Sequence, residues 1–133
     1  MAIPLSGSSP RVWLASGAVF AGLAVAAGAF GAHALRERLT VQQLATFETG
    51  VRYQMYHALA LFLVGWMTSR GGSALVSGAG TSFLVGIILF SGSLYGLSLT
   101  GVRWLGVITP LGGVAFLAGW SLMAVAAFRE WAG

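Results

Sequence analysis

The most informative part of this sequence for chemistry is the stretch from Phe47 to His57, which reads FETGVRYQMYH. Glu48 and Arg52 are four residues apart with the acid first, the order that favours an ion pair on a helix. Tyr53 and His57 share a helix face, whereas about 180° separates Glu48 from His57. We therefore expect the ion pair at a boundary of the membrane, with Tyr53 and His57 pointing into the protein.

A second histidine, His33, follows a long apolar run, and we expect it at the membrane level where the helix of His57 begins. Ionisable groups in membrane helices are often functional, and histidine titrates near neutral pH. One interpretation is that His33, Glu48, Arg52, Tyr53 and His57 line a small polar site or a proton path. The other is structural, and we favour it because the two later apolar segments contain no acid to continue a relay.

The sequence offers little for metal, cofactor or nucleic-acid chemistry. Two histidines cannot complete a zinc site, which needs three or four protein ligands, and the chain has no cysteine. Histidines that bind haem face each other in an apolar core, whereas His33 is terminal. The seven basic residues are isolated arginines and form no patch for nucleic acid. We expect no metal, no cofactor, no catalytic residue and no nucleic-acid partner. The sequence favours a protein without enzymatic activity over an enzyme.

The elements that carry these residues belong to a chain with very little charge. Hydrophobic residues make up 57% of its 133 residues and charged residues 8%, with three acids against seven bases. A soluble domain normally has about a quarter charged residues, because its surface faces water. The five Trp and 20 Gly also fit a membrane protein. The composition predicts an all-α integral membrane protein, a single transmembrane domain over residues 1–133.

Four apolar segments meet or approach the length of about 20 residues needed to cross a hydrocarbon core of about 30 Å. They cover residues 12–32, 53–69, 81–102 and 105–128, and charged residues lie at their boundaries or between them. Burying one charge in such a segment costs about 2.5–3.5 kcal/mol on insertion scales. The pattern predicts a four-helix bundle. A cleaved signal peptide ending near Ala32 is the alternative for the first segment, which is longer than the usual signal core of about 7–15 residues.

The connections between these segments differ in kind. Residues 34–52 place apolar side chains at near-helical spacing, which predicts an amphipathic interfacial segment between helices 1 and 2. Thr40 and Gln43 fit a capping box, so the second helix is alternatively expected to begin near Thr40 and to run on into the membrane. The stretch 71–80 is rich in glycine and predicts a flexible loop. Arg103 and Trp104 predict a tight hairpin between the last two helices.

Small residues mark the helix faces where backbones come close in lipid. We expect packing within one bundle more than packing between protomers. Pro110 either kinks the last helix or lies in its first turn with Thr109 as N-cap, and the sequence leaves both open. The glycines expected at helix contacts are Gly22, Gly28, Gly31, Gly92, Gly96, Gly112 and Gly113.

Four motifs, in order along four successive helices, resemble one known family. They are Gly28–His33 (GAFGAH), Glu48–Ala60 (ETGVRYQMYHALA), Phe90–Tyr95 (FSGSLY) and Thr109–Gly113 (TPLGG) followed by Gly119-Trp120. The chain resembles the domain-of-unknown-function 423 family of small bacterial inner-membrane proteins, related to eukaryotic transmembrane protein 256. The resemblance implies a four-helix, multi-pass protein of the bacterial inner (plasma) membrane, and no established activity. Within the third motif Ser91 and Tyr95 share a face, so we expect helix three to present hydroxyls toward helix two.

The arginines leave the orientation in the membrane open. Three of them (Arg11, Arg70 and Arg129) fall on one side and four (Arg36, Arg38, Arg52 and Arg103) on the other, so dual insertion is also open. We predict a structural or accessory membrane component that packs through Gly/Ala faces, with the lipid bilayer and a homo-oligomer or larger membrane complex as partners. The alternative is a small transporter or channel for protons or small ions, with its polar site around His57, Tyr53 and Glu48.

Overall fold

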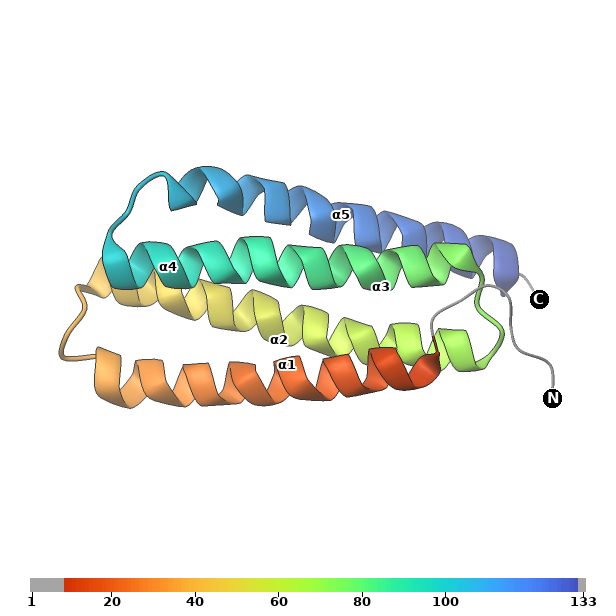
Figure 1. Cartoon of the computed structure of the whole chain (residues 1–133), viewed down its shortest axis with the longest axis horizontal. Coiled ribbons are helices and arrows are strands. Elements are labelled where there is room, and N and C mark those ends of the chain that lie inside the picture. The colour runs from red at the N-terminus through yellow and green to blue at the C-terminus, as the bar shows by residue number, and fades with distance from the viewer. Residues whose placement is uncertain (1–8, 132–133) are drawn as a thin grey trace.

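The computed structural model describes residues 9–131, which form four long rods lying side by side (Figure 1). Successive rods run antiparallel, so the α1–α2 and α4–α5 connections lie at one end of the molecule and the α2–α3 connection at the other. No strand occurs among the described residues, and the all-α, four-helix fold predicted from the sequence is confirmed. The elements are α1 (Pro10–Phe30), the π-helical turn η1 (Gly31–Leu35), α2 (Val41–Ser69), α3 (Ala74–Gly86), the π-helical turn η2 (Ile87–Ser91), α4 (Gly92–Thr100) and α5 (Leu105–Glu130).

Three of the four rods are long and apolar enough to cross a membrane: residues 10–35, 74–100 and 105–130. The fourth, α2, is less apolar because its first half carries Glu48, Arg52 and Gln54. With 29 residues it is nevertheless about 43 Å long at 1.5 Å per residue. It also lies along the other rods for most of their length (Figure 1). The position of α2 within the bundle, and not its composition, therefore supports it as a fourth span.

The start of α2 follows the capping box predicted at Thr40. The Gln43 backbone N–H donates to Thr40 Oγ1 at 3.1 Å, and the Thr40 N–H donates to Gln43 Oε1 at 2.9 Å. The segment expected to lie along the interface is thus the first part of α2 and not a separate element. Its apolar residue Phe47 is buried against Gly31, which explains why this part of the chain packs on the end of the first rod.

The flexible loop predicted for residues 71–80 is wrong beyond its first residues. Helix α3 begins at Ala74, with the Ser73 hydroxyl accepting the Leu75 N–H at 3.2 Å. Within this stretch only Gly71, at φ 89°, needs the backbone freedom of glycine. Gly80 instead lies against the ring of Trp13, 2.6 Å from where its Cβ would be. This glycine makes room on α3 for the Trp13 ring, which extends from α1, and glycine content alone does not reveal this role.

Pro110 lies inside α5, five residues after its start at Leu105, so the prediction that Thr109 is an N-cap is wrong. The Thr109 hydroxyl is instead 2.6 Å from the Ser93 hydroxyl, which joins α5 to α4. A proline at this point removes the helix bond to the carbonyl of Gly106. Of the two alternatives, the one that places Pro110 inside the last helix therefore describes the structure.

The glycines expected at helix contacts fall into two sets. Gly28 lies against Val51, Gly31 against Phe47, Gly96 against Leu105, and Gly112 against the backbone of Phe90. A methyl group added to Gly22, Gly92 or Gly113 would meet no atom within 4 Å. The first set holds the bundle together, and the second set faces outward or into grooves.

The rods do not form a closed square. Helix α2 packs against α1 on one side and against α3, η2 and α4 on the other, while α5 packs on α3, η2 and α4. Helices α2 and α5 therefore face each other across a groove whose floor is the third rod. The side chains that bridge this groove form the candidate site.

Candidate functional site

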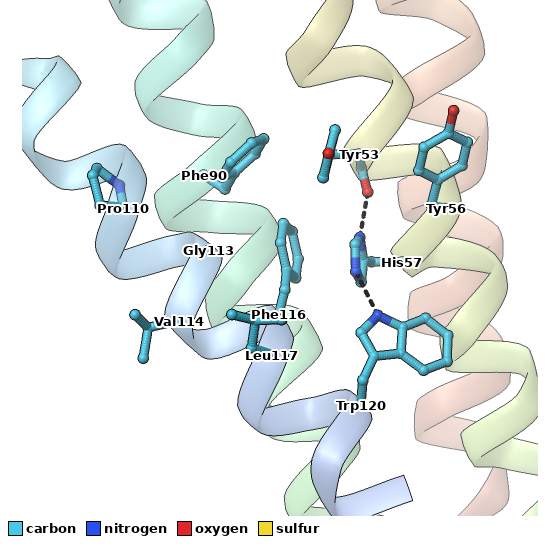
Figure 2. A pocket seen from close by; sticks show the side chains of 10 residues that line it. All are labelled: Tyr53, Tyr56, His57, Phe90, Pro110, Gly113, Val114, Phe116, Leu117 and Trp120. Carbon is cyan, nitrogen blue, oxygen red and sulfur yellow. Dashed lines mark hydrogen bonds between the residues drawn. The ribbon is translucent and has the colours of Figure 1, made fainter. Parts of the chain in front are cut away.

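The side chain of His57 extends from α2 toward α5 and is 4% exposed. Both of its ring nitrogens have hydrogen-bond partners (Figure 2). Its Nδ1 is 2.7 Å from the Tyr53 carbonyl oxygen, and Trp120 Nε1 donates to its Nε2 at 3.0 Å. An indole N–H only donates and a carbonyl only accepts. The contacts therefore place the histidine proton on Nδ1 and leave Nε2 as the acceptor. His57 is thus a neutral bridge from α2 to α5.

Aromatic rings surround His57 on several sides. The Phe116 ring stacks on it at a centroid distance of 3.5 Å and an interplanar angle of 9°. The Tyr53 ring lies 6.2 Å away at 19°, as expected for two residues on one face of α2. Two glycines make room for these rings, because Gly86 lies against Phe116, and the position of a Cβ on Gly119 is 2.5 Å from the Phe83 ring. Because Gly86 on α3 and Gly119 on α5 have no side chain, the rings can pack closely around the histidine.

Beside His57, a cleft of about 590 Å³ opens between α2 and α5. Tyr53, His57 and Tyr56 line it from α2, and Pro110, Gly113 and Trp120 line it from α5 (Figure 2). Tyr53 is 39% exposed and Tyr56 54% exposed. None of the residues that line the cleft is charged, so it suits an uncharged or apolar group.

A second polar centre joins three rods around Gln54. The Gln54 amide donates to the Phe20 carbonyl of α1 at 2.8 Å and accepts from the Tyr95 hydroxyl of α4 at 2.7 Å. One turn away, the buried Ser91 hydroxyl donates to the Gly50 carbonyl at 2.7 Å. The structure thus agrees with the prediction that Ser91 and Tyr95 face the second helix.

The five residues singled out from the sequence do not gather in one place. Tyr53 and His57 lie together, but Glu48 and Arg52 are exposed on the outside of α2. In the described chain no ion pair joins these two, and Arg52 Nη2 donates to the Thr49 hydroxyl at 3.3 Å. An exposed helix pair contributes only about 0.3–0.5 kcal/mol, too little to hold two long side chains in one geometry.

His33 lies at the far end of the first rod. It belongs to the π-helical turn η1, where its side chain is exposed. His57 follows the start of α2 at Val41 by 16 residues, about 24 Å along the helix axis. The two histidines thus occupy different depths. Over residues 9–131, no three His, Asp or Glu side chains gather in a way that could hold a metal ion.

Three members of these centres were not predicted from the sequence: Gln54, Phe116 and Trp120. One signal was present, since Trp120 stands in the middle of an apolar helix and not at its ends. An indole N–H in the middle of a membrane helix has no water to bond to, and the other helices supply few side chains that can accept. Such a position predicts a buried hydrogen bond, but it does not reveal that His57 is the acceptor.

Apolar rods whose polar side chains bond to neighbouring helices define a small, helical, multi-pass membrane protein. The chain belongs to the family described as "Protein of unknown function (DUF423)", whose model matches residues 27–113. The resemblance seen in the sequence motifs is thereby confirmed.

The chain is similar to membrane proteins of several bacteria. It is 48% identical over 120 residues to the UPF0382 membrane protein YwdK of Bacillus subtilis (strain 168), which covers 90% of this chain and 98% of the relative. It is 44% identical over 119 residues to a UPF0382 membrane protein of Staphylococcus epidermidis, covering 90% and 97%. No solved structure matches the chain. This is a bacterial multi-pass membrane protein of unestablished activity.

Proposed function

We propose that this protein is a structural or accessory membrane component that packs against another transmembrane helix through the outer face of α1. The observation that supports this most is the open face at Gly22, where an added methyl group would meet no atom within 4 Å. Ala18 and Ala26 lie one turn before and after it and are exposed. In lipid, small residues at this spacing let two helix backbones come close and gain van der Waals contact.

The inner face of α1 also contains small residues, and it packs against α2. Gly17 lies 2.9 Å, measured from its Cβ position, from the Ala58 carbonyl, and Gly28 lies against Val51, so small residues bring α1 onto α2. The outer face remains open, and only 17% of the most apolar stretch of this rod is buried, against 39% for residues 74–100 and 28% for residues 105–130. A second small-residue face on the least covered rod therefore supports a contact outside the bundle.

A second copy of this chain is the simplest partner for this face. Most oligomers are symmetric, and a twofold contact brings the same patch of both subunits together. The residues that define this face, Ala18, Gly22 and Ala26, have no charge and no side chain larger than a methyl group.

Cysteine cross-linking in native membranes tests this proposal, because the chain has no cysteine of its own. Ala26→Cys should form a disulfide-linked dimer on mild oxidation. Leu23→Cys is the matched control, since residue 23 is exposed at a similar depth but lies about 100° around α1 from Gly22, at the edge of the exposed face. Adding Gly22→Leu to Ala26→Cys should abolish the cross-link, whereas adding Gly92→Leu should preserve it. Equal cross-linking at residues 23 and 26, or none at either, would contradict the proposal.

The transporter alternative has less support. Both nitrogens of His57 have partners, and Glu48 lies on the outside of α2, away from the histidine. The polar groups near Gln54 are an amide and hydroxyls that bond to one another and to backbone. Vesicles containing the protein should therefore show no more proton flux than vesicles containing the His57→Ala variant. A flux that depends on His57 would restore the alternative.

A further inference from the structure

The groove between α2 and α5 is lined by two tyrosine hydroxyls that have no hydrogen-bond partner within the described part of the chain. Of the three tyrosines, Tyr95 bonds to Gln54, while the hydroxyls of Tyr53 and Tyr56 have no hydrogen-bond partner within residues 9–131. Both line the cleft beside His57. A hydroxyl without a partner is unfavourable where water is scarce, so a ligand that supplies acceptor oxygens there would be stabilised.

The exposed face of α2 continues outward from these tyrosines with two opposite charges. Arg52 precedes Tyr56 by four residues, and Glu48 precedes Arg52 by four, so each step is about 6 Å along the helix. All three side chains are exposed, and no ion pair joins the two charges. From the end of the bundle inward, a ligand would therefore meet a carboxylate, a guanidinium and two hydroxyls, in that order.

Farther along α2, the groove is apolar and long. The cleft beside His57 is followed by a second cleft of about 510 Å³, and Trp120 lines both. The second cleft is lined by Leu63, Met67 and Met123, among other apolar residues. From Tyr53 to Met67 is 14 residues, about 21 Å. Half of a hydrocarbon core is about 15 Å, so the groove can hold one acyl chain over the full depth of a leaflet.

We propose that this groove binds one zwitterionic glycerophospholipid with a primary ammonium group, of the phosphatidylethanolamine class. The ester carbonyls accept from Tyr53 and Tyr56 at the groove. The phosphate lies at Arg52 and the ammonium at Glu48, on the exposed face of α2 beyond the mouth of the groove. One acyl chain runs over Gly113 toward Trp120. The order of charges along α2 selects this class, because an anionic headgroup has no cation to pair with the carboxylate and a quaternary ammonium has no N–H to donate to it.

Gly113 provides a test that leaves the fold intact. It lines the cleft, and a Cβ atom added there would meet no protein atom within 4 Å. Gly113→Leu therefore enters the space of the acyl chain from a position where no neighbouring helix packs. Gly92→Leu is the matched control, because it enters the groove on the other side of the bundle, beside Phe20 and Tyr95, and a Cβ atom there also meets no atom within 4 Å.

The experiment measures lipid retained by the purified protein after incubation with mixed micelles of phosphatidylethanolamine, phosphatidylglycerol and phosphatidylcholine in equal amounts. Native mass spectrometry counts the lipids on each protein. We expect wild type and Gly92→Leu to retain one phosphatidylethanolamine, and Gly113→Leu to lose it. Glu48→Gln should reduce the preference over phosphatidylglycerol severalfold, up to about fivefold, because an exposed ion pair contributes up to about 1 kcal/mol.

Three results would overturn the proposal. Equal retention by Gly113→Leu and Gly92→Leu would show that the lipid binds elsewhere or only as part of the surrounding annulus. An unchanged lipid preference in Glu48→Gln would remove the assignment of the headgroup, and so would a preference of wild type for phosphatidylglycerol or phosphatidylcholine. None of these results bears on the α1 contact, which is tested by cross-linking at residue 26.

Discussion

At the scale of single residues, buried polar groups in this protein mostly bond to a neighbouring helix. His57 bonds to Trp120, Gln54 to Phe20 and Tyr95, and the Ser91 hydroxyl to the backbone of α2. Hydrocarbon contains no water to hydrogen-bond with these groups, so an unpaired polar group there would be unfavourable. Each of these hydrogen bonds therefore avoids an unpaired polar group and also determines which helices pack together. The polar residues that looked like a chemical path in the sequence thus act in the structure as links between helices.

The first prediction concerns the protonation of His57. Because its Nε2 accepts from Trp120 and its Nδ1 faces a carbonyl, we expect the neutral form with the proton on Nδ1 at neutral pH. Nitrogen-15 NMR of histidine-labelled protein measures this directly, and a His33→Asn variant assigns the two signals. A signal of the charged ring, or of the form protonated on Nε2 alone, would contradict the contacts described here.

The second prediction concerns the Gln54–Tyr95 hydrogen bond. Gln54→Met removes two hydrogen bonds and should lower the free energy of unfolding by about 1–2 kcal/mol, given an average near 0.6 and a maximum near 1.7 kcal/mol for such bonds in membranes. Tyr95→Phe should lower it by about 0.6 kcal/mol. In reversible unfolding by detergent, the double variant should lose less than the sum of the two. Strict additivity would mean that the pair does not interact.

At the scale of elements, the position of each glycine decides which helix faces meet. Gly112 lies against the backbone of Phe90, whereas its neighbour Gly113 faces the open cleft. The sequence motif predicts that both belong to a packing face, but it cannot say which of the two touches a neighbour, because that depends on the rotation of α5. The backbone that Gly112 meets at Phe90 belongs to the π-helical turn η2, which has no signature in the sequence.

The third prediction compares these adjacent glycines. Gly112→Ala forces a methyl group into the backbone of Phe90 and should lower the free energy of unfolding by about 1–3 kcal/mol, as overpacking does. Gly113→Ala adds a methyl group in open space and should leave it unchanged or raise it by up to about 1 kcal/mol, since alanine is the better helix former. Thermal unfolding in one detergent measures both. Equal effects of the two would contradict the rotation of α5 described here.

A local sequence signal predicted the boundary of a helix correctly only where the signal is compatible with a single local structure. A capping box satisfies specific backbone groups, so Thr40 and Gln43 correctly predicted where α2 begins. Glycine occurs both in flexible loops and at closely packed helix surfaces. The prediction for the stretch 71–80 was wrong because Trp13, a residue far away in the sequence, fills the space at Gly80. The contact of His57 with Trp120 was hidden for the same reason, since it joins residues 63 positions apart.

At the scale of the whole molecule, composition predicted the class because 8% charged residues cannot cover a surface in water. Composition is less informative for α2, which is the one rod too polar to qualify as a span by itself. Its exposed residues nevertheless form one stripe along the helix, which becomes apolar after Arg52 and ends at Arg70. The account of the fold, the α1 contact and the lipid groove all require that α2 crosses the membrane beside the other rods.

A depth profile along this stripe tests that requirement most directly, and it does not depend on orientation. Single cysteines replacing Glu48, Tyr56, Leu59, Leu63 and Ser69 are spin-labelled in vesicles, and the accessibility of each label to oxygen and to a water-soluble nickel complex gives its depth. We predict that depth increases from residue 48 to a maximum near residue 59, midway to Arg70, and decreases again toward residue 69. The same shallow depth at all five positions would place α2 on the membrane surface and contradict the account.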